Sequence, residues 1–256
     1  MCFDSEFLER GFIQKARPDG PQAGRARMMM PAPAGIVGTG IDNPEPEFLA
    51  RMDADHVFMM GDNPALPPMP ARPTLLDFLK HRMQGITIRH LLTSATKALE
   101  DGRDEAIVIA CLLHDISNGC LIRSDHGYWG AQMIAPYVSE EVAWAVQYHQ
   151  CLRYFADASE GYAYPESYDR FFGPDYVPPE YIGKDAEIAR KHRWYGTSRA
   201  ITRYDIYFFD DGASPDPEVF TDIIGRNFRN PEEGLGFDGS PVAHMWRTAI
   251  WPNNLL

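Results

Sequence analysis

An unbroken run of eight apolar residues, Ala106 to Leu113, ends in the adjacent pair His114-Asp115. An apolar run of this kind is typical of an element in the centre of a protein core. Burying an imidazole and a carboxylate at its end is costly unless each group has a strong partner, and a metal ion is the usual one. The pair therefore predicts a buried metal site to which other parts of the chain contribute ligands.

Further residues of the types that bind metal ions lie on both sides of this pair. The spacing of nearby apolar residues places each of them on the inner face or at the end of a predicted helix. A single histidine of this kind is more often a core or surface residue, but an ordered set favours a metal site. Imidazoles and carboxylates that converge in a dry interior suit Fe, Mn, Zn or Ni. The predicted ligands are His90, His114, Asp115, His126, His149 and Asp205.

The remaining histidines, His56, His81, His192 and His244, lack such a context, and we interpret them as structural.

The pattern from residue 74 onward predicts an all-α fold, because apolar residues recur at helical spacing and no strand-like alternation competes. Ser139 followed by two glutamates is a strong helix start, and Asp216-Pro217 caps and starts the last helix. A loop rich in tyrosine and proline is expected over residues 162–181. The expected helices cover roughly residues 75–85, 88–99, 104–114, 126–137, 139–152, 185–209 and 216–228.

Residues 1–73 differ from the rest, because eleven of the 21 prolines lie between Pro18 and Pro73. We predict an irregular arm that wraps the core and could serve as an oligomer contact or active-site cover. A disordered tail explains the composition equally well. A short helix is expected around residues 47–52. Residues 74–256 then form the metal-binding domain.

Composition excludes several classes of function. The net charge of −12 and the lack of a Lys/Arg cluster argue against nucleic acid as a partner. No apolar run is long enough to span a bilayer, and no secretory signal is visible. The four cysteines have no CxxC spacing, which fits a reduced protein. We therefore expect a cytoplasmic protein that acts on a small molecule and binds neither nucleic acid nor membrane.

The order His, His-Asp, Asp on successive helices resembles the HD-domain superfamily of metal-dependent helical proteins. The resemblance covers roughly residues 85–210, and its most specific segment is Leu-Leu-His-Asp-Ile at residues 112–116. It implies an HD-type helical bundle, and the additional pair of histidines is similar to the two-metal members. By that likeness, one ion takes His90, His114, Asp115 and Asp205, and the second takes His126 and His149, with Asp115 as the bridge.

Among two-metal HD proteins, the chain looks most like the mixed-valent di-iron oxygenases, which are myo-inositol oxygenase and the HD-type phosphonate oxygenases. The spacings of 24, 23 and 56 residues (His90 to His114, His126 to His149 and His149 to Asp205) are similar to the phosphonate branch. The resemblance implies two iron ions, Fe(II) and Fe(III), with Mn, Zn or Ni as alternatives. It also implies cleavage by O2 of a C–C or C–P bond next to a hydroxyl in a small polar substrate.

The sequence departs from these oxygenases at two places. After His-Asp it reads Ile116-Ser117-Asn118, where the inositol enzyme has a Lys and the phosphonate oxygenases a His, and Thr202 stands where a phosphonate-binding Arg is expected. The resemblance therefore carries over better for the metals than for the substrate. A di-metal phosphohydrolase that acts on a phosphate ester or nucleotide has the same ligands. A binding module with a structural metal is the third interpretation, less favoured because two six-coordinate ions would keep open positions.

Besides Asp115, two residues are candidates for catalysis or substrate binding. Arg153 lies one helical turn after His149, on the same face, and could hold an anionic substrate group. An ion pair with a nearby acid, such as Asp157 or Glu160, explains Arg153 equally well. Asn118 could bind a substrate hydroxyl or close the helix end. The aromatic residues Tyr162, Tyr164 and Tyr168 either line the mouth of the site or pack the loop.

Overall fold

The computed structural model describes residues 67–83, 85–118, 125–205 and 215–250, and the statements below refer to these. They form ten α-helices without a β-strand, so the predicted all-α fold is confirmed. Residues 1–66, with the helix expected at 47–52, lie outside the described residues. The helices are α4 (Leu75–His81), α5 (Gly85–Glu100), α6 (Glu105–Leu113), α7 (His126–Ile134), α8 (Glu140–Leu152), α9 (Glu166–Phe172), α10 (Glu180–Arg190), α11 (Tyr195–Asp205), α12 (Thr221–Asn227) and α13 (Ala243–Ile250).

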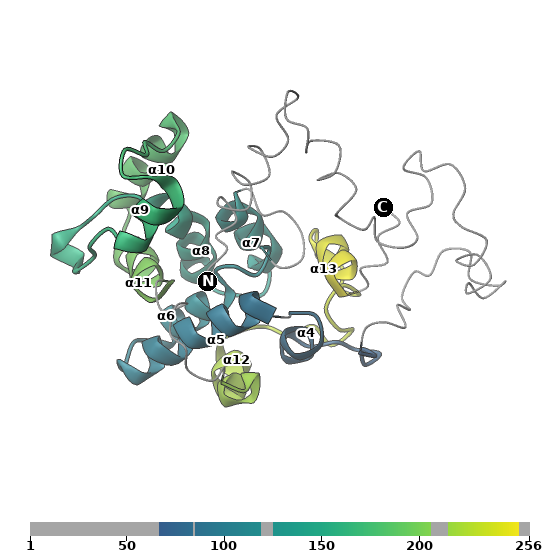
Figure 1. Ribbon diagram of the computed structural model, residues 1–256. Coiled ribbons are helices and arrows are strands. Elements are labelled where there is room, and N and C mark those ends of the chain that lie inside the picture. Colours follow the sequence, from purple (N-terminus) through teal and green to yellow (C-terminus); the bar gives the residue numbers. More distant parts are fainter. Residues whose placement is uncertain (1–66, 84, 119–124, 206–214, 251–256) are drawn as a thin grey trace, which may run out of the picture.

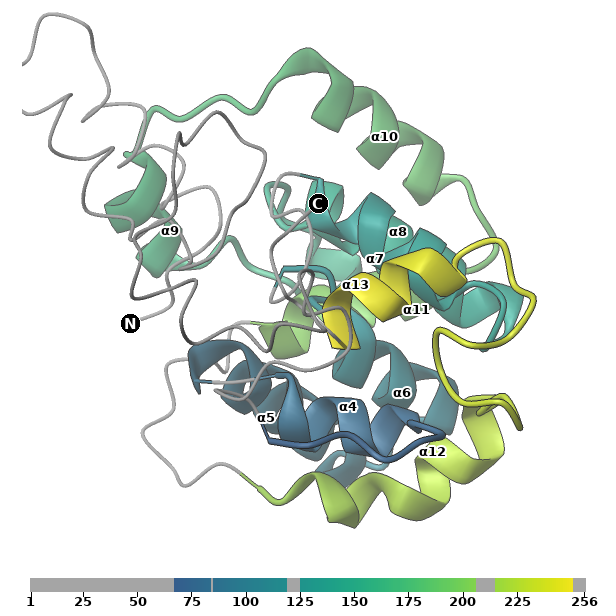
Figure 2. The same cartoon turned by 90° about the vertical axis from the view of Figure 1, so that its right-hand side faces the viewer.

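Helix α6 occupies the centre of the bundle. Its residues from Val108 to Leu113 are fully buried, because the helix is apolar on all sides and has no face that suits water. It packs against α5, α8, α11 and α12, and α5 and α12 lie on one side of it while α8 lies on the other (Figures 1 and 2). The pair His114-Asp115 at the end of α6 is therefore delivered to the middle of the molecule.

Local signals account for several helix starts. Thr74 and Asp77 form a reciprocal capping box at α4. The Ser139 hydroxyl accepts a hydrogen bond from the Val142 backbone N–H at 3.3 Å, as its position before two glutamates predicts. Asp216 caps the short 3-10 helix Pro217–Phe220, which leads directly into α12. The predicted helix start at Ser139 is confirmed, and Asp216 caps as predicted, but it begins a 3-10 helix and the α-helix itself begins at Thr221.

Three predictions about the helices are wrong. The single helix expected over residues 185–209 is two helices, because α10 ends at Arg190 and α11 begins at Tyr195. The ring of His192, in the break, stacks on Trp144 of α8 with centroids 4.0 Å apart. The loop expected over residues 162–181 contains α9 and the start of α10, and α13 was not predicted at all.

One hydrophobic core joins residues from Leu75 to Ile250. Trp246 of α13 is fully buried, donates its indole N–H to the Met133 carbonyl at 2.9 Å and packs edge-on against Phe78 of α4. The backbone N–H of Leu235 donates to the Pro73 carbonyl at 2.8 Å. The helices at both ends of the described chain therefore share one core with the central ligand-bearing helices.

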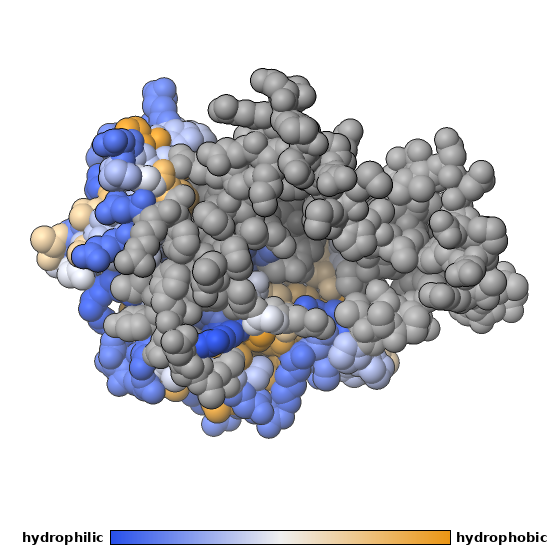
Figure 3. All heavy atoms as spheres, in the orientation of Figure 1, coloured by the Kyte–Doolittle hydropathy of each residue, from blue (hydrophilic) through white to orange (hydrophobic). Residues whose placement is uncertain are grey.

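The surface of the described residues in Figure 3 is largely hydrophilic, with smaller hydrophobic patches. Within the described ranges, none of the helices combines the length and the apolar character that crossing a bilayer requires.

Candidate metal centre

The structure brings all six predicted ligands together from five helices. His90 lies on α5, His126 is the first residue of α7, His149 lies on α8, and Asp205 ends α11. His114 and Asp115 follow directly after Leu113, the last residue of α6. All four imidazoles are buried, Asp205 is 8% exposed, and the Asp115 side chain is 13% exposed. The site is thus a converging cluster in the interior, as the helical register predicts.

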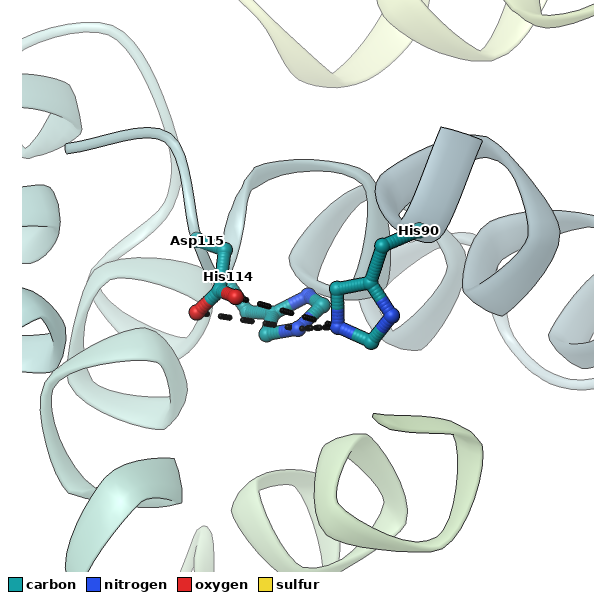
Figure 4. Close-up of side chains that lie close together, drawn as sticks. All are labelled: His90, His114 and Asp115. Carbon is teal, nitrogen blue, oxygen red and sulfur yellow. Dashed lines mark hydrogen bonds and ion pairs between the residues drawn. The ribbon is translucent and has the colours of Figure 1, made fainter. Parts of the chain in front are cut away.

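The first group of ligand atoms surrounds the Nε2 atom of His90. It lies 2.9 Å from Nε2 of His114, 2.9 Å from Oδ1 of Asp205 and 3.8 Å from Oδ2 of Asp115. Nε2 of His114 lies 3.6 Å from the same Asp205 oxygen. Figure 4 shows the rings of His90 and His114 turned toward each other, with the Asp115 carboxylate beside them. These four residues are the set assigned by resemblance to one ion.

The second group gathers around the other oxygen of Asp115. Oδ1 lies 3.1 Å from Nε2 of His126 and 3.6 Å from Nε2 of His149. The two groups His90-His114-Asp115 and Asp115-His126-His149 each meet the geometric requirements of a metal-binding cluster. Asp115 is common to both groups: Oδ1 faces His126 and His149, with Nε2 of His114 at 3.8 Å from the same oxygen, and Oδ2 faces His90.

The spacing of these atoms fits a metal ion. Bonds of about 2.1 Å place neighbouring ligands of an octahedral ion roughly 3.0 Å apart and opposite ligands about 4.2 Å apart. The separations between the ligand atoms run from 2.9 to 3.8 Å and so lie close to this range. Nε2 of His149 and Oδ2 of Asp205 are also buried without a hydrogen-bond partner among the described residues. Unsatisfied buried atoms cost about 1–3 kcal/mol each, which a bound cation would remove.

Backbone carbonyls hold two of the imidazoles in the orientation that a ligand needs. Nδ1 of His114 lies 2.7 Å from the Cys111 carbonyl, and Nδ1 of His149 lies 2.6 Å from the Val146 carbonyl. Because a carbonyl only accepts, Nδ1 carries the proton in both rings and the lone pair on Nε2 is directed at the site. This arrangement follows from the helix, since the carbonyl three residues earlier lies beside the ring.

The electrostatics of the cluster favour ionised carboxylates. Burial raises the pKa of Asp115 and of Asp205, but the surrounding histidines hold both well below the usual range. Burial lowers the pKa of His126 to about 3 and also lowers that of His149. For His114, burial acts in the same direction, but Asp115 and Asp205 outweigh it and raise the pKa to about 9. The site therefore carries a negative charge that a cation would balance, and a proton on His114 competes with that cation.

Arg153 lies beside this cluster at the end of α8 and is only 4% exposed. Its guanidinium lies over the rings of Tyr154 and Tyr168, at 5.3 and 5.9 Å from their centroids. Its charge contributes to the lowered pKa of His126, which places it near the second group of ligands. The carboxylate of Asp157 accepts from Ser159 and Tyr195. These observations give Arg153 a buried position near the second group of ligands, and its role toward a substrate stays a prediction.

The other predicted residues have defined positions. The Asn118 side-chain amide donates to Oδ2 of Asp115 at 3.3 Å, so it orients the carboxylate common to both groups. The Tyr162 hydroxyl donates to the Arg153 carbonyl at 2.8 Å, and Tyr164 packs edge-on against Tyr168. Thr202 is buried and donates to the Arg199 carbonyl at 2.8 Å. Tyr162 and Tyr168 thus contact Arg153, and Tyr164 packs behind Tyr168.

Arg199 is a site-supporting residue that the sequence interpretation missed. It is fully buried, donates to the Leu152 carbonyl at 2.8 Å and to the Tyr195 hydroxyl at 3.2 Å, and lies over the ring of Tyr162. It thereby ties the end of α8, which carries His149, to α11. The helical spacing gave no signal for it, because a residue six positions before Asp205 lies about 120° away around the helix.

No protein-family model matches the chain, and no curated protein matches it. The likeness to HD-domain proteins therefore stays a prediction from the ligand series.

Proposed function

We propose that this chain is a two-metal enzyme of the HD type, in which the ions lie on either side of Asp115. The observation that carries the proposal is the orientation of this carboxylate. Oδ1 lies 3.1 Å from His126 and 3.6 Å from His149, Oδ2 lies 3.8 Å from His90, and His114 lies 3.8 Å from Oδ1, so the carboxylate stands between the two groups of histidines. A site for one ion would need no second group of histidines on the far side of the shared aspartate.

We further propose that the enzyme is a di-iron oxygenase that cleaves a C–C or C–P bond next to a hydroxyl. Four imidazoles with two carboxylates suit iron better than magnesium or calcium, which prefer oxygen ligands. When bound, the two ions would supply a binding place for O2 and for the substrate hydroxyl, and would pass electrons from the substrate to O2. The compact spacing of the ligands along the chain, similar to the phosphonate oxygenases, supports this choice over a hydrolase.

The residues of the chain have separate tasks in this proposal. Asp115 holds both ions and keeps its orientation through Asn118, while the Nδ1 bonds of His114 and His149 fix the direction of their lone pairs. The burial of all four histidines excludes water from reactive species. Arg153 binds an anionic group of the substrate.

The test is to reconstitute the metal-free protein with Fe(II) and, separately, with Mn(II), and to assay two reactions. We expect O2 consumption by the iron form when hydroxylated phosphonates or hydroxy acids are added. Hydrolysis of phosphate esters by the manganese form, without O2 consumption by the iron form, would instead identify a di-metal phosphohydrolase.

Arg153→Ala should weaken the binding of anionic substrates while leaving two metals per chain. A guanidinium has no lone pair to offer a metal, but it can hold a phosphonate or carboxylate at two points in a dry site. Losing a contact of about 2–5 kcal/mol corresponds to a loss in affinity on the order of 30-fold or more. Arg153→Lys should recover only part of this, because a point charge does not reproduce the fork. Calorimetry with a hydroxylated phosphonate measures the effect.

A suitable control is Arg190→Ala, because Arg190 also lies over an aromatic ring, that of Phe155, but is exposed. It should leave both metal content and substrate affinity unchanged. If Arg153→Ala lowers the melting temperature markedly and binds the phosphonate as the wild type does, Arg153 is a structural residue and the proposal of an anionic substrate fails.

A further inference from the structure

His126 is held from both sides by side chains that are not themselves ligands. The Ser117 hydroxyl donates to the His126 carbonyl at 2.9 Å. The next residue, Gly127, donates its backbone N–H to the side-chain oxygen of Gln150 at 3.2 Å. Ser117 and Gln150 are both buried, and each lies one or two residues from another ligand. The position of His126 is thus linked to the segments that carry Asp115 and His149.

Helix α7 needs this support because its start is unusual. Asp125, the residue before His126, has φ of 51°, a left-handed conformation that is uncommon for residues other than glycine. Its side chain makes no capping hydrogen bond to the helix. The first N–H groups of a helix have no partner within it, and the usual one is the capping side chain. Gln150 of α8 supplies the acceptor that Asp125 does not.

The contact between α7 and α8 is also so close that the two helices cannot shift freely against each other. A Cβ atom on Gly127 would lie 2.8 Å from the Gln147 carbonyl oxygen and 3.0 Å from the Val146 carbonyl oxygen. The first turn of α7 therefore rests directly on the backbone of α8, one turn before His149. The Gln150 side chain takes part in the same contact, because its Cβ would lie 3.4 Å from a Cβ on Gly127 and its oxygen accepts from the Gly127 N–H.

We propose that Gln150 is a positioning residue for the second metal ion, and this rests on the two-metal function proposed above. Its side-chain oxygen caps α7 from the neighbouring helix and fixes His126 relative to His149. Among the described residues, its side chain makes no hydrogen bond with the first group of ligands. Loss of this acceptor should weaken the ion held by His126 and His149 and spare the ion held by His90 and Asp205.

The experiment is calorimetric titration of the metal-free, full-length protein with Mn(II). The wild type should bind two ions. Asp205→Ala removes a ligand of the first ion only, so the binding step that remains in this variant is that of the second ion, held by His126 and His149. Gln150→Met keeps the size of the side chain but removes the acceptor. It should weaken the affinity for the second ion about 10-fold or more and leave the affinity for the first ion unchanged. Groups outside the ligand shell have effects of this size on metal affinity.

Two further variants separate positioning from packing. Gln150→Glu retains an acceptor at a helix N-terminus, where a negative charge is favourable, and should restore the second step to within a few-fold of the wild type. Gln147→Met, on the same helix, is the control, because the Gln147 side chain makes no hydrogen bond with the described residues. It should bind both ions normally.

The outcomes are distinct. If the wild type binds two ions and Gln150→Met binds both with unchanged affinity, the role of Gln150 is refuted and the two-metal proposal stands. If the wild type binds fewer than two ions, the two-metal proposal and the role of Gln150 fail together. Should Gln150→Met not fold, Ser117→Ala carries the test. It removes one hydroxyl from the other side of His126 and should produce the same selective loss, whereas normal binding of both ions would contradict the account.

Discussion

Asp115→Ala is expected to lose both metal ions, whereas His149→Ala loses mainly one. The reason is that the Asp115 carboxylate belongs to both groups of ligands, so its removal takes one ligand from each proposed ion. His149 contributes to the second group alone. Metal analysis of each variant, expressed in the same medium and purified without chelators, measures the number of ions per chain.

Asp104→Ala is the matched control for this prediction. Asp104 precedes the same helix, α6, but is exposed and makes no capping hydrogen bond. It should retain two ions, which separates damage to the site from damage to the helix. An Asp115→Ala protein that is folded and still carries two ions would remove the bridging assignment.

Removal of the metals should lower the melting temperature of the wild type by about 15 °C or more. Ligands that bind only the folded protein stabilise it by about 4 kcal/mol each at a thousandfold excess over their dissociation constant. For a domain of this size, 1 kcal/mol corresponds to roughly 2–4 °C. The metal-free protein also keeps buried polar atoms, such as Oδ2 of Asp205, without a hydrogen-bond partner in the described structure. Thermal unfolding followed by circular dichroism, before and after chelation, gives the difference.

Restoration distinguishes a specific site from a general effect of the chelator. Fe(II) added without oxygen should restore the melting temperature, whereas Mg(II) at the same concentration should not, because it prefers oxygen ligands. A melting temperature that does not change when the metals are shown to have left would mean that the cluster is satisfied by its own hydrogen bonds.

The ligand cluster was predictable because its signals are local. Ligands within a helix share a face with apolar neighbours, as His149 does with Val142 and Val146, so burial of the face carries the ligand inward. The apolar run before His114 required a central helix. The order of the ligands then fixed which helices had to meet, and the structure brings them together.

Features that depend on contacts between distant segments were not predictable. No proline or glycine marks the break between α10 and α11, where His192 stacks on Trp144. The tyrosine and proline content around α9 concealed its limits, although Gly173, with φ of 92°, ends it as a glycine often does. The support of His126 by Gln150 depends on a left-handed residue and a close helix contact, neither of which leaves a periodic pattern in the sequence.

Low-temperature electron paramagnetic resonance during stepwise reduction tests the central claim most directly, because it reports whether two irons share a bridge. Two ions on either side of Asp115 should be magnetically coupled. The account predicts that the iron-loaded protein shows little signal when oxidised, a coupled mixed-valent signal at one electron per pair, and loss of that signal on full reduction. A signal of isolated ferric iron that only declines on reduction, or a single iron per chain, would contradict it.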